Sequence, residues 1–89
     1  MDRLEATRIF IAVADAGSLS AAARRLDQPL ATVSRKLAAL EDHLGARLLT
    51  RTTRRIALTE VGRRFLDAGR RVLADMDAAE RAVVGTVGE

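Results

Sequence analysis

The chain has 89 residues, of which 15 are basic and 12 acidic, for a formal net charge of +3, and it contains no cysteine. A chain of this length forms one small domain that buries too little surface to be very stable alone, so we expect a dimer or a part of something larger. The absence of cysteine excludes a disulfide framework and a thiolate metal site, and it fits a reducing compartment.

The first predicted helix begins at "DRLE", where Asp2 can cap the helix and Glu5 can close a capping box. It ends before Gly17, which suits the left-handed position after a helix. One face suits a core and carries Ala6, Ile9, Phe10, Val13 and Ala14. Leu4 and Ile11 form a second stripe that suits a partner, although stray exposed apolar residues are common. Charged residues within this segment exclude a signal peptide and a membrane span, so we expect a soluble, cytoplasmic protein.

Two further helices are predicted on either side of a short polar turn. The second helix starts at the Ser18-Leu19-Ser20 cluster, runs to Leu26 and buries one stripe made of Leu19, Ala22, Ala23 and Leu26. The turn is Asp27-Gln28-Pro29. The third helix ends at Gly45, and one of its faces carries Leu30, Val33, Leu37, Leu40 and Leu44. Together these helices outline a helix-turn-helix at about residues 19–38.

The outward face of the third helix has the profile of a helix that enters the major groove of DNA. Arg35 lies opposite the apolar stripe, and its neighbours on that face are Ala31, Thr32, Ser34, Lys36, Ala38 and Ala39. Small side chains allow close approach, and a few long donors near the amino-terminal end can reach base edges. A face that is merely solvated would more often alternate Glu and Lys, as the acidic pair Glu41-Asp42 begins to do beyond this portion.

Residues 47–58 are predicted to form a wing, that is, two short strands around a basic tip. Leu48-Leu49-Thr50 and Ile56-Ala57-Leu58 supply the strands, and alternation places Ile56 and Leu58 on one face. The tip carries Arg51, Thr52, Arg54 and Arg55. Basic tips can serve solubility alone, but beside a recognition helix we favour insertion into a minor groove or contact with the backbone.

Charge is unevenly distributed along the chain. From residue 47 to residue 71 there are eight arginines and two acids, whereas from residue 75 to the end there are four acids and one arginine. Arginine favours bidentate contacts with phosphate and guanine. The basic middle is typical of a nucleic-acid-binding protein, although arginines that merely solvate helices explain the charge alone equally well.

A long helix is predicted over residues 59–89, with Thr59 as its cap and Glu60 at the positive end of its dipole. Its apolar positions recur in steps of three and four for three heptads, starting at Gly62. Because the domain of residues 1–58 is expected to be complete without it, we predict that the helix pairs with a second copy, Gly69 allowing close approach. The alternative is that it folds back on its own domain. The predicted dimer interface comprises Phe65, Gly69, Val72, Leu73, Met76, Ala79 and Val83.

Catalysis finds little support in the sequence. His43 is the only histidine, and without cysteine it has no obvious metal or nucleophilic partner. No glycine-rich phosphate loop is present, and no cofactor is expected. The two aromatic residues, Phe10 and Phe65, both lie on apolar stripes, which argues against a base-stacking platform for RNA or single strands. We therefore predict a binding protein and not an enzyme.

The chain resembles the amino-terminal DNA-binding region of LysR-type transcriptional regulators. The resemblance is carried by "FIAVADAGSLSAAARRL", by "TVSRKLAALEDHLGARLLTRTTRRIALTEVG" and by the long helix that follows. It implies a mainly α fold, a winged helix-turn-helix with three helices and a two-stranded wing, followed by a linker helix that forms a dimer. It also implies base or phosphate contacts at Leu30, Ala31, Thr32, Ser34, Arg35 and Lys36, and a minor-groove contact at Arg54. In the family a small-molecule effector binds a further domain, which we expect to be absent from these 89 residues.

Two residues depart from the family pattern. Asp27 stands where glycine is usual, but aspartate tolerates the left-handed conformation, so we expect the turn to persist. Pro29 stands where a serine or threonine usually caps the recognition helix. We expect Pro29 in the first turn of that helix, with Asp27 or Gln28 approaching the cap.

The leading hypothesis is a dimeric module that binds double-stranded DNA of defined sequence. One rival is a protein-interaction module in which the long helix is the functional element and the basic face only aids solubility. A second rival is a nonspecific chromosome-coating protein, with steep salt dependence and a specificity ratio near one.

Overall fold

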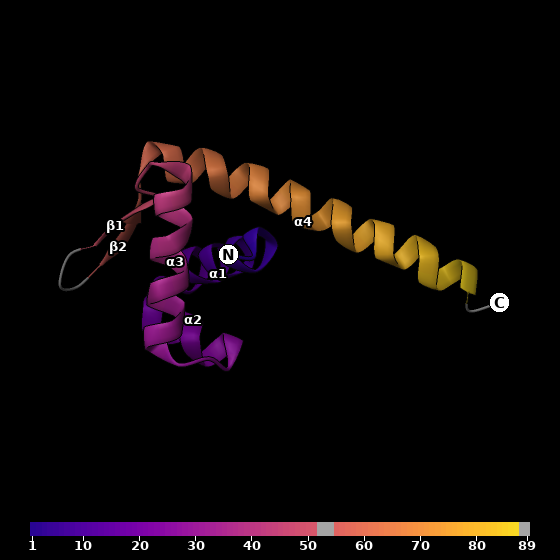
Figure 1. Ribbon diagram of the computed structural model, residues 1–89, viewed down its shortest axis with the longest axis horizontal. Helices are drawn as coiled ribbons and strands as arrows, with labels where there is room; N and C mark the ends of the chain where they lie inside the picture. Colours follow the sequence, from indigo (N-terminus) through magenta and orange to yellow (C-terminus); the bar gives the residue numbers. More distant parts are fainter. Residues whose placement is uncertain (52–54, 88–89) are drawn as a thin grey trace.

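The fold is mainly helical, with a two-stranded wing between its third and fourth helices (Figure 1). The computed structural model describes residues 1–51 and 55–87. Its elements, in chain order, are α1 (Arg3–Ala16), α2 (Leu19–Leu26), α3 (Leu30–Leu44), β1 (Leu49–Arg51), β2 (Ile56–Leu58) and α4 (Glu60–Val87). The predicted fold class, a winged helix-turn-helix followed by a long helix, is confirmed.

The helix ends follow local sequence signals. Asp2 Oδ1 accepts a hydrogen bond from Glu5 N at 3.0 Å, but the Glu5 side chain does not close the predicted capping box; it pairs with α3 instead. Gly17 and Gly45 are left-handed and end α1 and α3, as predicted. Asp27 is left-handed as well, with φ 53°, so the turn persists without glycine.

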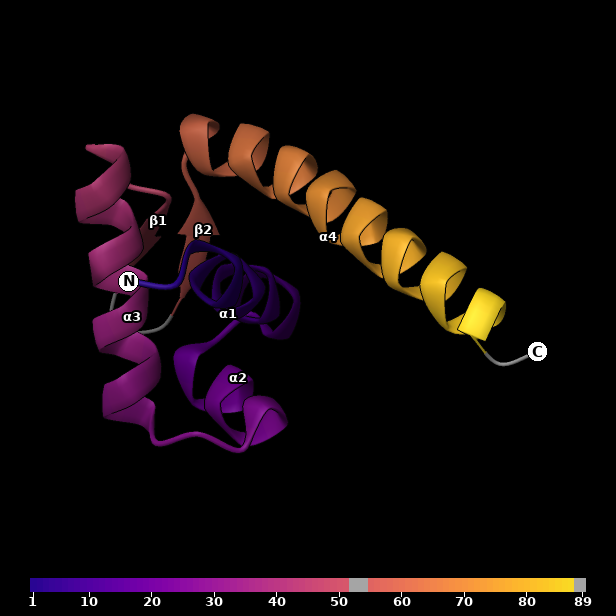
Figure 2. The same ribbon diagram turned by 45° about the vertical axis from the view of Figure 1, so that its right-hand side comes forward.

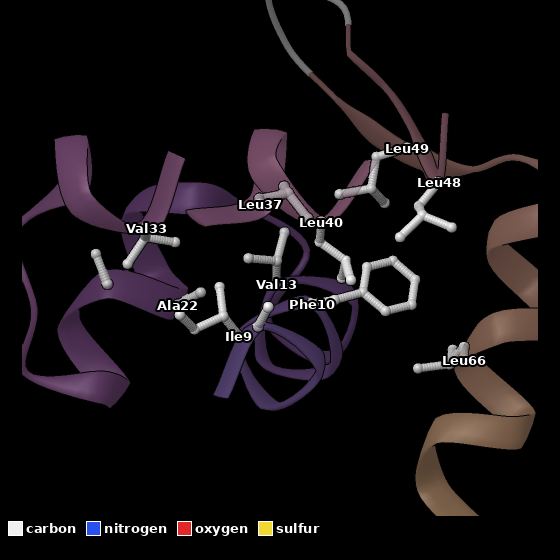
Figure 3. Close-up of a cluster of buried hydrophobic side chains, with 12 residues drawn as sticks. Ile9, Phe10, Val13, Ala22, Val33, Leu37, Leu40, Leu48, Leu49 and Leu66 are labelled. Atoms are coloured by element: carbon white, nitrogen blue, oxygen red, sulfur yellow. The ribbon is translucent and has the colours of Figure 1, made fainter. Parts of the chain in front are cut away.

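The core lies where α1, α2 and α3 meet the base of the wing (Figure 3). Ile9, Phe10 and Val13 of α1 are at most 1% exposed and lie at its centre. They are surrounded by side chains from the other elements, namely Ala22, Ala23, Val33, Leu37, Leu40, Leu48, Leu49 and Leu66. Apolar burial of this kind is the main stabilising contribution to a domain of this size.

The predicted stripe of α3 is buried only in its middle. Val33, Leu37 and Leu40 are at most 1% exposed, whereas Leu30 is 48% and Leu44 39% exposed. The prediction that Val33, Leu37, Leu40 and Leu44 are buried is therefore wrong for Leu44 alone. Leu44 lies in the last turn of α3 and lines a hollow together with Leu4, Phe65 and Val72, so its side chain stays partly open to solvent.

The beginning of α4 belongs to the same core. The ring of Phe65 lies 5.7 Å from that of Phe10, and Leu66 is 9% exposed. A Cβ on Gly69 would lie 3.0 Å from the Thr7 methyl, so α4 crosses α1 closely at this point. Arg70 forms an ion pair with Asp15 of α1, at 2.6 Å.

These contacts correct two expectations. The domain of residues 1–58 is not complete without the long helix, because Phe65 and Leu66 cover part of its core. Phe65 and Gly69, which were predicted to face a second copy, pack against α1 of their own chain. The alternative that the helix folds back on its own domain is therefore correct for its first part, while the rest of α4 extends away from the domain (Figures 1 and 2).

Candidate nucleic-acid interface

The outward face of α3 combines one long cationic side chain with small neighbours. Arg35, Ala31 and Ala38 are exposed, and Thr32 and Ser34 are half-buried. Within residues 1–51 and 55–87, the Arg35 side chain takes part in no hydrogen bond or ion pair. Because the side chains around it are short, a flat or grooved polyanion can approach the backbone of this helix closely.

The front end of α3 has no side-chain cap. Pro29 is the capping residue itself, one position before the first helical residue, and neither Asp27 nor Gln28 bonds to the helix start. This corrects the expectation that Pro29 lies in the first turn with one of those side chains as the cap. The Pro29 carbonyl accepts from Thr32 N and Val33 N, at 3.1 Å each. The earlier N–H groups of α3 find no acceptor in the described part of the chain, and together with the helix dipole they favour a nearby anion.

Lys36, unlike Arg35, forms an ion pair within the chain. Its Nζ lies 2.8 Å from Glu5 Oε1, and the two side chains are 33% and 41% exposed. The ion pair connects α3 to the first turn of α1. Because both groups are partly solvated, its net contribution to stability is small, on the order of 1 kcal/mol or less.

The wing lies beside α3 (Figures 1 and 2). Strands β1 and β2 are antiparallel, and Arg51 pairs with Ile56. Ile56 and Leu58 are half-buried while Ala57 is exposed, which confirms the predicted alternation. Arg51 and Arg55 are exposed at the ends of the strands nearest the tip. The predicted contacts Thr52 and Arg54 lie outside the described residues.

Glu41 is a residue whose role the sequence pattern did not reveal. We expected it on a solvated face, but it is 7% exposed, and its Oε2 accepts from Leu48 N at 2.7 Å and from Leu49 N at 3.3 Å. One signal was present: Glu41 lies four residues after Leu37 and eight after Val33, on the buried ridge of α3. The prediction placed Glu41 on a solvated face because its side chain is charged, and the spacing was not used.

Beyond residue 71, α4 carries exposed apolar side chains. Val72 is 51% exposed, Met76 37%, Val83 63% and Val84 69%. Ala79 is exposed as well, and Leu73 is half-buried. Large exposed apolar residues that recur along one helix are typical of an interaction surface.

The described residues offer no obvious catalytic or membrane-spanning feature. No three His, Cys, Asp or Glu side chains among them gather in a group that could hold a metal ion. His43 is exposed in the last turn of α3. Within the same part of the chain, no helix combines the length and apolar character needed to cross a membrane.

Comparison with known proteins identifies the family. Residues 4–63 match the model described as "Bacterial regulatory helix-turn-helix protein, lysR family". An "HTH-type transcriptional regulator" of Xanthomonas campestris pv. campestris (strain 8004) is 50% identical over 80 residues, which cover 90% of this chain and 23% of that protein. The chain thus spans about a quarter of the length of the curated relatives it matches.

Two solved structures of DNA complexes are similar in fold. Full-length CbnR "complexed with the target DNA complex" has a TM-score of 0.83 at 39% identity, over 94% of this chain and 29% of that one. The "BenM_DBD/catB site 1 DNA Complex" has a TM-score of 0.94 at 28% identity, over 100% and 98%. The relatives are named as transcriptional regulators, and their family is not enzymatic. This chain belongs to the lysR family of bacterial regulatory helix-turn-helix proteins.

Proposed function

We propose that the chain binds double-stranded DNA in a sequence-specific manner and serves as the DNA-binding segment of a transcriptional regulator. The observation that carries the proposal is the unpaired Arg35 among small side chains on α3, beside a wing with exposed Arg51 and Arg55. The proposal is supported by the similar CbnR and BenM proteins, which have been solved in complex with DNA.

In this proposal the amino-terminal half of α3 enters the major groove. Arg35 donates to the guanine edge or an adjacent phosphate, and the exposed Leu30 and Ala31 offer apolar contact to thymine methyl groups. Thr32 and Ser34 supply short hydroxyl contacts. Lys36, whose ammonium is already paired with Glu5, contributes mainly by holding α3 against α1.

The wing is proposed to lie at the minor groove next to the site that α3 reads. Arg51 and Arg55, together with Thr52 and Arg54, supply basic and polar groups there. Narrow A·T-rich minor grooves have an enhanced negative potential that attracts arginine. The wing therefore contributes preference for flanking sequence as well as affinity.

A second copy is proposed to pair along the distal part of α4, through Val72, Leu73, Met76, Ala79 and Val83, with Val84 beside them. A hollow lined by Leu4, Leu44, Phe65 and Val72 continues this apolar stripe onto the domain.

Charge favours an antiparallel arrangement of the two helices. Residues 60–74 of α4 carry four arginines and two acids, whereas residues 75–87 carry three acids and one arginine. In an antiparallel pair the basic part of each helix lies beside the acidic part of the other. A parallel pair would place like charges side by side.

Selection of preferred duplexes from a random pool, at physiological salt, tests the proposal. A palindromic or half-palindromic consensus is the expected result, because a dimer presents two copies of α3. Binding without enrichment and with a steep salt slope would favour a nonspecific DNA-coating protein. Failure to bind duplex DNA by a chain that still associates through α4 would favour a protein-interaction module.

A further inference from the structure

Glu41 occupies a position that is unfavourable for a carboxylate. It lies in the last turns of α3, near the negative end of the helix dipole, and it is 7% exposed. A buried charge persists only where hydrogen bonds or an opposite charge compensate for lost solvation. The compensating contacts therefore indicate what the carboxylate does.

Within the described part of the chain, every polar contact of this carboxylate reaches the residues that begin the wing. Its Oε2 accepts from Leu48 N at 2.7 Å and from Leu49 N at 3.3 Å, and Arg47 Nε lies 3.5 Å away. The Arg47 side chain is 66% exposed, so the two amides are the better-shielded partners. A single oxygen atom thus fixes the backbone at the start of β1 to α3.

The same segment is held from the opposite side by the start of α4. Leu48 O accepts from Thr59 N at 3.0 Å, and Thr59 Oγ1 donates to Arg47 O at 2.6 Å. Thr59 Oγ1 also accepts from Gly62 N at 2.9 Å, as the cap of α4. Residues 47–49 are therefore held in a clamp between α3 and α4. Glu41 supplies the hydrogen-bond acceptor from α3, the proposed recognition helix.

We propose that Glu41 is a positioning residue for DNA recognition: it sets the place of the wing relative to α3, and with it the spacing between the wing arginines and Arg35. Arg35 lies six residues before Glu41 on α3, and Arg51 lies two residues after Leu49 on β1. A shift at the clamp therefore changes the distance between the two groups of DNA contacts. This inference rests on the proposed function.

The test compares Glu41 variants in a chain that keeps the wing arginines with the same variants in a chain whose wing arginines are replaced by alanine. The second chain is said to have its wing disabled. Glu41→Leu removes the acceptor, whereas Glu41→Gln keeps a carbonyl oxygen that can accept from both amides. Each is made in the unaltered chain and in an Arg51→Ala/Arg54→Ala/Arg55→Ala background, which removes every arginine of the wing tip. Asp42→Asn, which alters the exposed acid next in sequence, is the control. Affinity is measured for the selected duplex with its own flanks and with G·C flanks, and amide hydrogen exchange is followed at Leu48 and Leu49.

Glu41→Leu is expected to lower affinity for the flanked duplex about 10-fold and to speed exchange at Leu48 and Leu49. Glu41→Gln is expected to keep most of the affinity and most of the protection from exchange. Asp42→Asn is expected to change neither the affinity nor the exchange rates. With the wing disabled, Glu41→Leu is expected to cost less than about 2-fold, because its effect passes through the wing. If the Leu variant does not fold, Glu41→Asp, whose carboxylate is one methylene shorter and reaches the two amides poorly, provides the same comparison in both backgrounds.

Equal losses of affinity with and without the wing arginines would overturn the inference, since Glu41 would then act only on general stability. Wild-type affinity in Glu41→Leu would overturn it as well. If the unaltered chain selects no duplex, the proposed function fails and the inference falls with it. The two failures are therefore distinguishable.

Discussion

In the proposed function, Arg35 is the side chain on which specific recognition most depends. It is exposed on α3, and its neighbours Ala31 and Ala38 are too small to replace its contacts. Replacing Arg35 with alanine should cost roughly 1–3 kcal/mol of binding to the selected duplex and relax preference at one or two base pairs. Arg8→Ala, a change at an exposed arginine of α1, should leave that preference unaltered. Competition binding with single-base variants of the duplex measures both, and an unchanged preference in Arg35→Ala would refute its assigned role.

Two glycines of α4 differ in what surrounds them. A Cβ on Gly62 would lie 2.0 Å from the carbonyl oxygen of Leu48, which is backbone and cannot move aside, whereas a Cβ on Gly85 would meet nothing within 4 Å. Gly62→Ala should therefore lower the free energy of unfolding by roughly 2–3 kcal/mol. Gly85→Ala should leave it unchanged or raise it by up to about 1 kcal/mol. Urea denaturation of the two variants measures the difference, and equal stabilities would contradict the close approach of α4 to the wing.

At the scale of the element, α2 depends strongly on its cap because it has only 8 residues. Ser18 Oγ accepts from Ala21 N at 3.0 Å, whereas Ser20 is exposed within the helix. Ser18→Ala should lower the free energy of unfolding by about 1 kcal/mol, and Ser20→Ala should change it by less than about 0.5 kcal/mol. Thermal unfolding followed by circular dichroism distinguishes the two. A larger loss of unfolding free energy for Ser20→Ala than for Ser18→Ala would contradict the stabilising role of the Ser18 cap.

The long helix is one element in sequence but two in packing. Up to Arg70 it contributes Leu66 and part of Phe65 to the core and pairs with Asp15 of α1. After that point it carries Val72, Met76 and other exposed apolar residues. The apolar periodicity is the same in both parts, so periodicity alone does not distinguish a face that covers the domain from one that remains available to a second copy.

At the scale of the whole molecule, the exposed stripe of α4 predicts self-association. The chain measures 52 × 26 × 21 Å, and the long dimension follows α4 as it leaves the domain (Figure 1). Met76→Glu combined with Val83→Glu places charges on the stripe and should convert a dimer to a monomer without loss of helix content. Ala78→Glu, on the opposite face of the same helix, should leave the dimer intact. Sedimentation over a range of concentrations tests this, and an unaltered chain that is monomeric at every concentration would refute the pairing.

Much of the fold was predictable because its signals are local. The caps at Asp2 and Ser18, the left-handed residues at Gly17 and Gly45, and the alternation around Ala57 each depend on a few neighbouring residues. Helix and strand periods then assign the apolar faces. For the candidate site, the small side chains around Arg35 were predictable in the same way, since a face opposite a buried stripe must point outward. The roles of those residues in binding DNA stay proposals.

The chain's local patterns were enough to determine its elements, their order, the apolar faces of α1 to α3 and the family to which it belongs. The tertiary structure alone decided which of the matching positions are covered: Phe65 and Gly69 pack against their own α1, whereas Val72 stays 51% and Met76 37% exposed. It also decided that Glu41 lies inside, and that Lys36 turns to Glu5 while Arg35 does not. The physical reason is that burial and pairing depend on the lengths and crossing points of elements distant in sequence, which no local pattern records.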